Sequence, residues 1–595
     1  MPDAATEAKK PAPPRDSVRE AIETVVFVVV LVLLLKLFVT EAFVIPTGSM
    51  AETLYGYQKI IPCPKCGHEF PVNSHDEVEG RDGVRHQLEA YTCPNCRHHG
   101  RVAELNPIPA NRTGDRVLVL KPIYHLQEPR RGDVVVFKYP KEPQQKQTAQ
   151  NYIKRAMGLG GETVAIHHGE LFVTRSLDYP ADALDADGTP LYPRPDDPKE
   201  LWRGGDSVFS TDYRYPNSRD AVSLFAKSRA AGFPSEGGGF EIVRKPDTQV
   251  LADRRVVWDN DQQSAEFAAL GMTPRWHDPV GTVVKPWAKW TPDDPRLPRA
   301  FAHAGGDLDW VRYRHNVWLL DDQQKPIRLW LSADLPTLPG PGPVDNFLGY
   351  NAGGSKNMAR DSRAPEYERL WVGDLILECE AEIDAGGEVA LELSRGATRF
   401  RATFAGGEVA LASTGPGARE FGKRPSGVTG PGKYKLRFAN VDCRLRVWVN
   451  DRLVAFGTDA DYAPGEPAAA DGTAPEGWTT ANDVDAPAGI GAKGAVTVRG
   501  VKLHRDIYYT RSGFDADRAD PDRADLYYVQ PGHYLCLGDN SASSSDSRSW
   551  GLVPDRLLLG KAVFVFWPGP WYESTGRMPW QFRIDFRSNR IGFIK

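Results

Sequence analysis

The stretch Phe-Val-Ile-Pro-Thr-Gly-Ser-Met at residues 43–50 follows directly on a long apolar run. From Val25 to Val39 only Lys36 interrupts a block of Val, Leu and Phe. With its shoulders, over residues 21–43, the block is long enough for one membrane helix, which needs about 20 residues. The turn that follows would therefore place the hydroxyl of Ser49 at the membrane surface.

The charges before the apolar run predict its orientation. Residues 1–20 are rich in Ala, Pro and charged residues, so we expect a disordered tail, and its basic residues are Lys9, Lys10, Arg15 and Arg19. Lys and Arg favour the cytoplasmic side of a membrane, which predicts a cytoplasmic N-terminus and places everything after Thr40 outside. A cleaved signal peptide is the alternative, but the run is long and residues 40–43 make a poor cleavage site, which favours an uncleaved anchor.

Length and composition predict several β-rich domains. The chain has 595 residues, which is too long for one core. Its 56 Gly and 48 Pro residues, with plentiful aromatic side chains, are typical of strands joined by many turns, so the predicted fold class is mainly β. The net charge of −5 offers no bulk attraction to nucleic acid, and no nucleic-acid partner is expected.

Four of the seven cysteines form two Cys-Pro-x-Cys pairs, Cys63 with Cys66 and Cys93 with Cys96. A Cys-x-x-Cys turn points two thiolates at one ion, and two such turns complete a tetrahedral zinc site. The spacing therefore predicts a zinc ribbon over residues 57–106 with one structural zinc. Two disulfides in an oxidising exterior are the alternative, but a two-residue gap makes a strained local disulfide, which favours zinc.

A lysine follows two strand-like segments and lies in apolar sequence. Residues 113–121 alternate in strand fashion after a Gly-Asp turn, and residues 131–140 do the same. In the next segment, Ile153 and Ala156 imply apolar surroundings for Lys154. Desolvation disfavours the ammonium and lowers the pKa of a buried lysine. A neutral amine can then take the proton from a serine hydroxyl.

Three ordered blocks carry a resemblance to a known family. They are residues 43–50, the segment Tyr-Ile-Lys-Arg-Ala-Met-Gly at residues 152–158, and the segment Gly-Asp-Asn-Ser-Ala-Ser-Ser-Ser-Asp-Ser-Arg at residues 538–548. In this order they resemble the bacterial signal peptidase I family of membrane-bound Ser/Lys proteases. The resemblance implies a membrane-anchored serine endopeptidase that removes signal peptides from exported preproteins and needs no cofactor for catalysis.

The resemblance also implies which residues carry the reaction. Ser49 would attack the scissile carbonyl, and Lys154 would act as general base and then as general acid, without a histidine. The backbone N–H of Ser49 and the hydroxyl of Thr47 would hold the oxyanion. Met50 would pack beneath the serine. The residues that match the shallow apolar pockets for the substrate are Phe43, Ile45, Leu54, Tyr152 and Ile153.

Three further residues match supporting positions of the family. Ser544 would hydrogen-bond the Lys154 amine and orient it. Asp546 and Arg548 would form an ion pair that fixes their loop beside the reacting pair. The sequence differs from the family pattern just after Met50. Residues 51–54 read Ala-Glu-Thr-Leu, where the family usually has a proline two residues after the methionine. The loop is therefore expected to be looser, with Glu52 adding a charge near the site.

The resemblance covers separate parts of the chain and so implies a core divided by insertions. The expected divisions are a cytoplasmic tail at 1–20, a transmembrane helix at 21–43, the first part of the core at 44–56 and 107–175, a zinc ribbon at 57–106, an irregular extension at 176–325, a jelly-roll β-sandwich at 326–510, and the second part of the core at 526–595.

Strand-like segments recur between Gly-rich turns in the second half of the insertion, which predicts the β-sandwich. They are residues 375–383, 389–393, 399–404, 433–438 and 444–449. With the motifs at 440–442 and 448–450, the pattern resembles concanavalin-like (laminin-G-like) jelly rolls. That resemblance suggests a carbohydrate or an envelope protein as ligand, although such sandwiches also serve as spacers. Cys379 and Cys443 are expected in the core or as a disulfide pair.

Taken together, the sequence predicts a single-pass protein of the inner membrane with its catalytic domain on the outer, periplasmic face. Its expected partners are signal peptides of secretory preproteins and the bilayer, with the protein-export machinery as a further candidate. A catalytically inactive homologue that binds carbohydrate or protein is the alternative. A self-cleaving repressor type of Ser/Lys protease is a second alternative, which the anchor disfavours. We expect the sandwich to be replaceable by a short linker without loss of cleavage.

Overall fold

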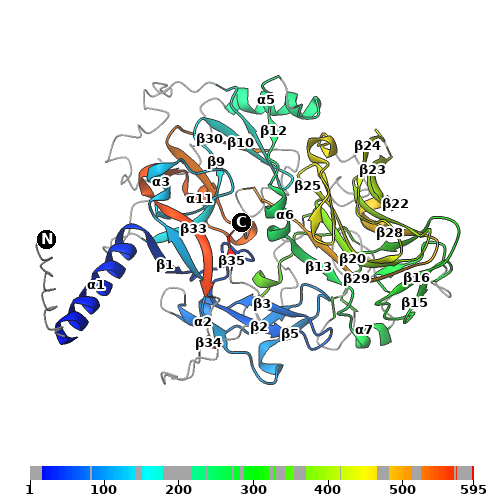
Figure 1. Cartoon of the computed structure of the whole chain (residues 1–595), viewed down its shortest axis with the longest axis horizontal. Coiled ribbons are helices and arrows are strands. Elements are labelled where there is room, and N and C mark those ends of the chain that lie inside the picture. The colour runs from blue at the N-terminus through cyan, green and yellow to red at the C-terminus, as the bar shows by residue number, and fades with distance from the viewer. Residues whose placement is uncertain are drawn as a thin grey trace, which may run out of the picture.

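The computed structural model describes residues 17–80, 84–140, 150–177, 218–234, 237–270, 274–281, 287–317, 319–320, 326–327, 342–353, 370–415, 417–464, 481–511, 524–567, 571–572 and 592–594 (Figure 1). Strands dominate these residues, and the predicted mainly β fold class is confirmed. The tail predicted to be disordered lies, up to residue 16, outside the described residues.

The apolar run forms one long helix that projects from the body of the molecule (Figure 1). Helix α1 spans Ser17–Phe38, and its apolar window, Val18–Phe38, has a mean hydropathy of 2.7 with none of it buried. A helix of 22 residues is about 33 Å long, close to the thickness of a bilayer's hydrocarbon core. Length and composition therefore fit one membrane span. The predicted bounds of 21–43 are corrected, because the helix starts earlier and residues 40–44 form a strand.

The helix passes almost directly into the first strand of the core. Strand β1 (Thr40–Val44) pairs antiparallel with β7 (Arg116–Leu120). Lys121 closes this junction, because its Nζ donates to the carbonyl oxygens of Lys36 and Leu37 at 3.4 and 3.3 Å and pairs with the Glu41 carboxylate at 2.7 Å. A cation is favourable at the C-terminal end of a helix. The junction thus ties the end of α1 to the core.

Two sheets, which we call the core sheets, combine strands from distant parts of the chain (Figure 1). The first has the order β1-β7-β33-β8-β9-β31-β32, with β35 beside β33, and the second has the order β12-β11-β10-β30. Their bounds are β8 Val134–Lys138, β9 Asn151–Gly158, β10 Glu162–His167, β11 Glu170–Thr174, β12 Glu241–Ile242, β30 Asp525–Val529, β31 His533–Leu537, β32 Val553–Pro554, β33 Leu558–Trp567 and β35 Gly592–Phe593. The pairing of β9 with β31 agrees with a core split by a long insertion.

The two cysteine pairs lie at the turns of two short hairpins, which we call the ribbon. One hairpin joins β2 (Gln58–Pro62) to β3 (Glu69–Asn73), and the other joins β4 (Ala90–Thr92) to β5 (His99–Arg101). The first hairpin continues into a sheet of order β3-β2-β6-β34, with β6 at Asn111–Arg112 and β34 at Trp571–Tyr572. This arrangement is the one expected of a ribbon whose turns face one another.

The long insertion contains two antiparallel sheets packed face to face, so the predicted β-sandwich is confirmed. One sheet has the order β15-β16-β29-β20-β25-β26-β27, with β13 also on β29, and the other has the order β14-β17-β28-β21-β22-β23-β24. One apolar core joins side chains of both sheets. The bounds are β13 Arg255–Asp259, β14 Trp276–His277, β15 Thr291–Pro292, β16 Phe301–His303, β17 Asp309–Tyr313, β20 Leu375–Ile383, β21 Glu388–Arg395, β22 Thr398–Ala405, β23 Glu408–Thr414, β24 Glu420–Pro425, β25 Gly432–Val441, β26 Arg444–Val449, β27 Arg452–Leu453, β28 Ala488–Lys493 and β29 Val496–Arg505. The finer resemblance to laminin-G-like jelly rolls stays a prediction.

The predicted boundary at residue 326 is wrong. Strands β13 and β16 pair with β29, and β17 pairs with β28, so these three strands belong to the sandwich rather than to an irregular extension. These strands are short and lack a clear alternation. Phe301 of β16, Trp276 of the neighbouring β14 and Trp290, just before β15, enter the sandwich core. The disulfide alternative for Cys379 and Cys443 is also wrong, because both are free thiols in different apolar clusters.

The remaining described elements are short. They are α2 His75–Val78, α3 Ile123–Leu126, α5 Ser218–Ala230, α6 Asp247–Asp253, α7 Ala265–Ala269, α9 Ala481–Asp485, α11 Ser547–Trp550, β18 Leu319–Leu320, β19 Pro326–Ile327, and the 3-10 turns η1 Val102–Glu104, η3 Gly349–Asn351, η5 Gly457–Ala460, η6 Ser541–Ser543 and η7 Asp555–Leu557.

Replacing residues 326–509 with a Gly/Ser linker should unfold strands β13, β16 and β17. The replacement removes β28 and β29, so Trp276, Trp290 and Phe301 lose the sheets they pack against. Limited proteolysis of the detergent-solubilised protein should then cut within β13, β16 and β17, which should resist cleavage in the full chain. Equal resistance of the two proteins would show that these strands fold without the rest of the sandwich.

Candidate active site and four-cysteine site

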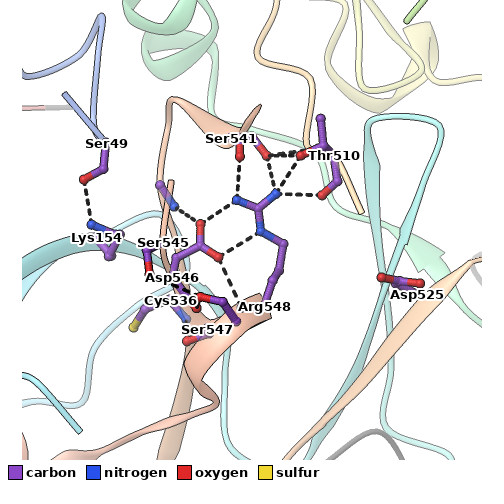
Figure 2. Close-up of polar contacts among 12 residues, drawn as sticks. Ser49, Lys154, Thr510, Asp525, Cys536, Ser541, Ser545, Asp546, Ser547 and Arg548 are labelled. Carbon is purple, nitrogen blue, oxygen red and sulfur yellow. Dashed lines mark hydrogen bonds and ion pairs between the residues drawn. The ribbon is translucent and has the colours of Figure 1, made fainter. Parts of the chain in front are cut away.

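The structure brings Ser49 and Lys154 together from different elements (Figure 2). Ser49 lies in the turn after β1, and Lys154 lies in the middle of β9. Lys154 Nζ donates to Ser49 Oγ at 2.7 Å and to the carbonyl oxygen of Ile153 at 3.0 Å. The two predicted residues are therefore within hydrogen-bond reach, as a nucleophile and its base must be.

Burial shifts the titration of this lysine. Lys154 is only 2% exposed, and the ring centroid of Tyr152 lies 5.4 Å from its Nζ. Desolvation of the ammonium lowers the pKa of Lys154 to about 8, and the Asp546 carboxylate offsets only part of that effect. A substantial fraction of the amine is thus neutral near pH 8.

The turn that carries Ser49 is held by the segment after β31. The backbone N–H of Asn540 donates to the Ser49 carbonyl oxygen at 3.1 Å, and the Asn540 side chain donates to the Gly48 carbonyl oxygen at 2.9 Å. Gly538 lies so close that a Cβ there would collide with the Ser49 carbonyl oxygen and with Ser544 Oγ. The role of Asn540 was not predicted from the sequence, although the residue stands in the block at 538–548.

Of the supporting residues, Asp546 and Arg548 behave as predicted (Figure 2). Arg548 Nε and Nη2 donate to the two Asp546 oxygens at 2.8 and 2.6 Å. Burial alone would raise the pKa of Asp546, but the guanidinium and the Gly538 N–H hold it below its ordinary value. Arg548 also donates to the Thr510 carbonyl oxygen at 2.7 Å. Both side chains are therefore charged, and their ion pair fixes the loop at residues 538–548.

Ser544 does not make its predicted contact. Its Oγ is buried and no hydrogen bond joins it to Lys154, while a weaker contact with the Asp546 carboxylate helps to lower the pKa of that group. Thr47 is exposed on the turn two residues before Ser49, and its part in an oxyanion hole stays a prediction. Met50 is fully buried in an apolar cluster with Ile45 and Leu54.

The five predicted substrate-contacting residues fall into two apolar clusters, and their role in binding substrate stays a prediction. Ile45 and Leu54 are buried in one apolar cluster, against which Phe43 and Ile153 are partly buried. Tyr152 packs in a different cluster, where its ring centroid lies 4.8 Å from that of Tyr139. Of the predicted residues in the first cluster, Phe43 and Ile153 are therefore the two that are partly exposed.

Parts of the chain are similar to known signal peptidases. The family described as signal peptidase, peptidase S26, matches residues 98–194 and 488–567, which include Lys154 and the block at 538–548. Signal peptidase I of Pseudomonas aeruginosa is 37% identical over 92 residues, covering 13% of this chain and 32% of that protein. Signal peptidase I of Aquifex aeolicus is 41% identical over 76 residues, covering 13% and 24%. The predicted resemblance to the signal peptidase family is confirmed.

The similarity covers only part of this chain and only part of each signal peptidase. The chain spans about a third or less of the curated signal peptidases it matches, and the family match does not include Ser49. A carbohydrate binding module, CBM66 from Bacillus subtilis, aligns with 40% of this chain and 94% of its own at 12% identity and a TM-score of 0.18. The assignment of Ser49 therefore rests on its sequence block and on its contact with Lys154.

The four ribbon cysteines converge on one point between the two hairpins. Their sulfurs all lie within 4.8 Å of one another. The Sγ atoms of Cys63 and Cys96 are 3.6 Å apart, and those of Cys66 and Cys93 are 3.7 Å apart. Four sulfurs around a zinc ion at about 2.3 Å would be about 3.8 Å apart in a tetrahedron. All four are buried free thiols, which contradicts the disulfide alternative and fits a closed metal site.

Proposed function

We propose that this protein is a signal peptidase I, a membrane-anchored serine endopeptidase that cleaves signal peptides from exported preproteins. The observation that carries the proposal is the 2.7 Å contact between Ser49 Oγ and the buried Lys154 Nζ. The partial match to signal peptidases supports the substrate class. The inactive alternative is disfavoured, because a chain that only binds has no need for a lysine of lowered pKa beside a serine.

In the proposed reaction the neutral Lys154 amine accepts the Ser49 proton while Oγ bonds to the scissile carbonyl carbon. The oxyanion accepts hydrogen bonds from the Ser49 N–H and the Thr47 hydroxyl. The C–N bond then breaks as the Lys154 ammonium gives its proton to the leaving amine, which leaves an ester on Ser49. Water, deprotonated by the same amine, hydrolyses the ester and regenerates the serine.

The proposed location follows from the junction of α1 and β1. The strand begins two residues after the helix ends, so the Ser49 turn lies within a short stretch of chain from the membrane. We place the N-terminus in the cytoplasm and the active site on the outer face of the inner membrane, where the substrate's cleavage site emerges. A carbohydrate or an envelope protein stays the proposed partner of the sandwich.

We also propose that Cys63, Cys66, Cys93 and Cys96 hold one structural zinc. Four protein ligands leave no open position, so the ion would have no hydrolytic role. It would supply folding free energy to the two hairpins and join their turns.

Ser49→Ala and Lys154→Arg should each abolish cleavage of a preprotein by the detergent-solubilised protein. Ser49→Ala removes the nucleophile, and a guanidinium cannot act as base because it stays protonated. Ser545→Ala and Lys433→Arg are matched controls at exposed positions and should cleave like the wild type. Appreciable cleavage by Lys154→Arg would contradict the assignment of the base.

The cleavage rate should depend on pH through Lys154. Only the neutral amine accepts the proton, so kcat/KM should rise about tenfold per pH unit below the pKa and level off above about 8. The measurement is the initial rate on a peptide substrate from pH 6 to 10. A rate that falls between pH 6 and 8 would contradict a neutral lysine base.

Protein purified without added zinc should contain about one equivalent of zinc. Cys93→Ser should lower this content, whereas Cys443→Ala, which alters a thiol outside the ribbon, should not. Elemental analysis measures the zinc content, and thiol titration measures how many cysteines are reduced. Four oxidised cysteines without metal would show that the zinc proposal is wrong.

A further inference from the structure

A segment of the long insertion contacts the turn that carries the proposed nucleophile. We call residues 344–351 the bridging segment. It ends in the 3-10 turn η3 (Gly349–Asn351) and lies about three hundred residues after Ser49 in the sequence. Leu348 and Tyr350 of this segment form a small apolar cluster with Ala51 and Tyr55, which follow Ser49 directly. The segment therefore packs on the turn itself.

Two residues of the bridging segment limit how the turn can move. The Tyr350 ring fills the space where Gly48 would carry a Cβ, and its centroid lies 5.3 Å from that of Tyr55. Asn351 and Asn540 exchange two side-chain amide hydrogen bonds, each of 2.7 Å. The second amide proton of Asn540 goes to the Gly48 carbonyl oxygen at 2.9 Å. Asn351 thus orients the Asn540 side-chain amide, which donates to Gly48, the residue before Ser49.

The bridging segment is itself held at its other end by the ribbon. The Arg97 guanidinium pairs with the Asp345 carboxylate at 2.5 Å and lies 3.8 Å from the ring centroid of Phe347. Gly349 packs against Pro94, which stands between Cys93 and Cys96. From the sandwich, buried Arg505 donates to the carbonyl oxygens of residues 346 and 347 at 2.8 Å. The segment is therefore fixed on both sides before it reaches the turn.

The sandwich also contacts the position where this chain departs from the family. Arg255, on β13, donates to the Ala51 carbonyl oxygen at 3.4 Å and lies 3.9 Å from the Glu52 carboxylate. The turn that was expected to be looser is thus supported by a cation from the insertion. These contacts from the insertion add to the packing of Met50 and Leu54 against strands of the core sheets.

We propose that the insertion positions the nucleophile, with Asn351 acting through Asn540 on the Gly48–Ser49 turn. The proposal rests on the proposed peptidase function for its kinetic consequence, but its structural content is independent of that function. Asn351 has no contact with Lys154 or Ser49 Oγ among the described residues, so it is a positioning residue. Its effect should appear in kcat, because misplacing a reacting group by about 1 Å can lower a rate about a hundredfold.

The test compares Asn351→Ala, Asn540→Ala and the double variant in the full-length, detergent-solubilised protein. Each single variant should lower kcat for preprotein cleavage by about tenfold to a hundredfold with KM changed less than about twofold. The double variant should be no slower than Asn540→Ala alone, because the two residues act through one contact. Asn482→Ala, which removes a side chain bonded to Arg399 within the sandwich, is the control and should cleave like the wild type.

Hydrogen exchange measures how firmly the Ser49 turn is held, and it does not require enzymatic activity. The amides of Ala51 and Leu54 donate to the carbonyl oxygens of Gly48 and Met50 within the turn. Exchange of a peptide covering residues 46–57 should be faster in Asn351→Ala than in the wild type and unchanged in Asn482→Ala. Faster exchange in a protein whose wild type does not cleave would uphold the positioning role and refute only the peptidase function. Unchanged exchange, or rate losses that add in the double variant, would overturn the proposal.

Discussion

A lysine side chain can accept a proton near neutral pH only if its surroundings disfavour the ammonium form. Lys154 meets this condition because β9 carries it into the interior and the segments around Ser49 and β31 close over it, which leaves it 2% exposed. The 2.7 Å contact with Ser49 has chemical meaning only in that setting. The closure over Lys154 is therefore the constraint on which the proposed activity depends, and much of the remaining architecture serves to maintain it.

That closure joins parts of the chain that are far apart in sequence. Arg155, the neighbour of Lys154 on β9, points to the other side of the strand and makes a buried bidentate pair with Asp539, at 2.8 and 2.6 Å, while Asp253 of α6 lies 3.5 Å away. A buried charge without its partner is strongly unfavourable, so the two halves of the core and the insertion must assemble together. A second buried pair, Asp546 with Arg548, is bonded to Thr510 at the end of the insertion, because Arg548 donates to the Thr510 carbonyl oxygen. The insertion is thus bonded into the core rather than attached by a flexible loop.

The sequence predicted what local patterns encode. Ser49, Lys154, the pair of Asp546 and Arg548, and the four ribbon cysteines lie in short ordered blocks, and the structure brings each set together. Strands β20 and β26 have the predicted bounds. Gly386 and Gly387 follow β20, and two-residue turns with positive φ, Asp442-Cys443 and Asn450-Asp451, flank β26.

What the sequence did not predict depends on contacts across long separations. No sequence motif surrounds Asn351, Tyr350 or Arg255. They support the Ser49 turn only because the fold places them against it. The short strands β13, β16 and β17 show too little alternation to be assigned to the sandwich before their partners are known. Ser544 was assigned from a resemblance, and its buried hydroxyl forms no bond to Lys154 in this structure.

The central claim is that the Lys154 amine loses its proton far below the ordinary range for a lysine. The most direct measurement is the pH dependence of the Lys154 side-chain Cε signal in a protein with 13C-labelled lysine, assigned by its absence from the spectrum of Lys154→Arg. The structure predicts a midpoint near pH 8. A midpoint near pH 10.5, the ordinary value for lysine, would contradict the account, because the amine would then be charged beside Ser49 at neutral pH.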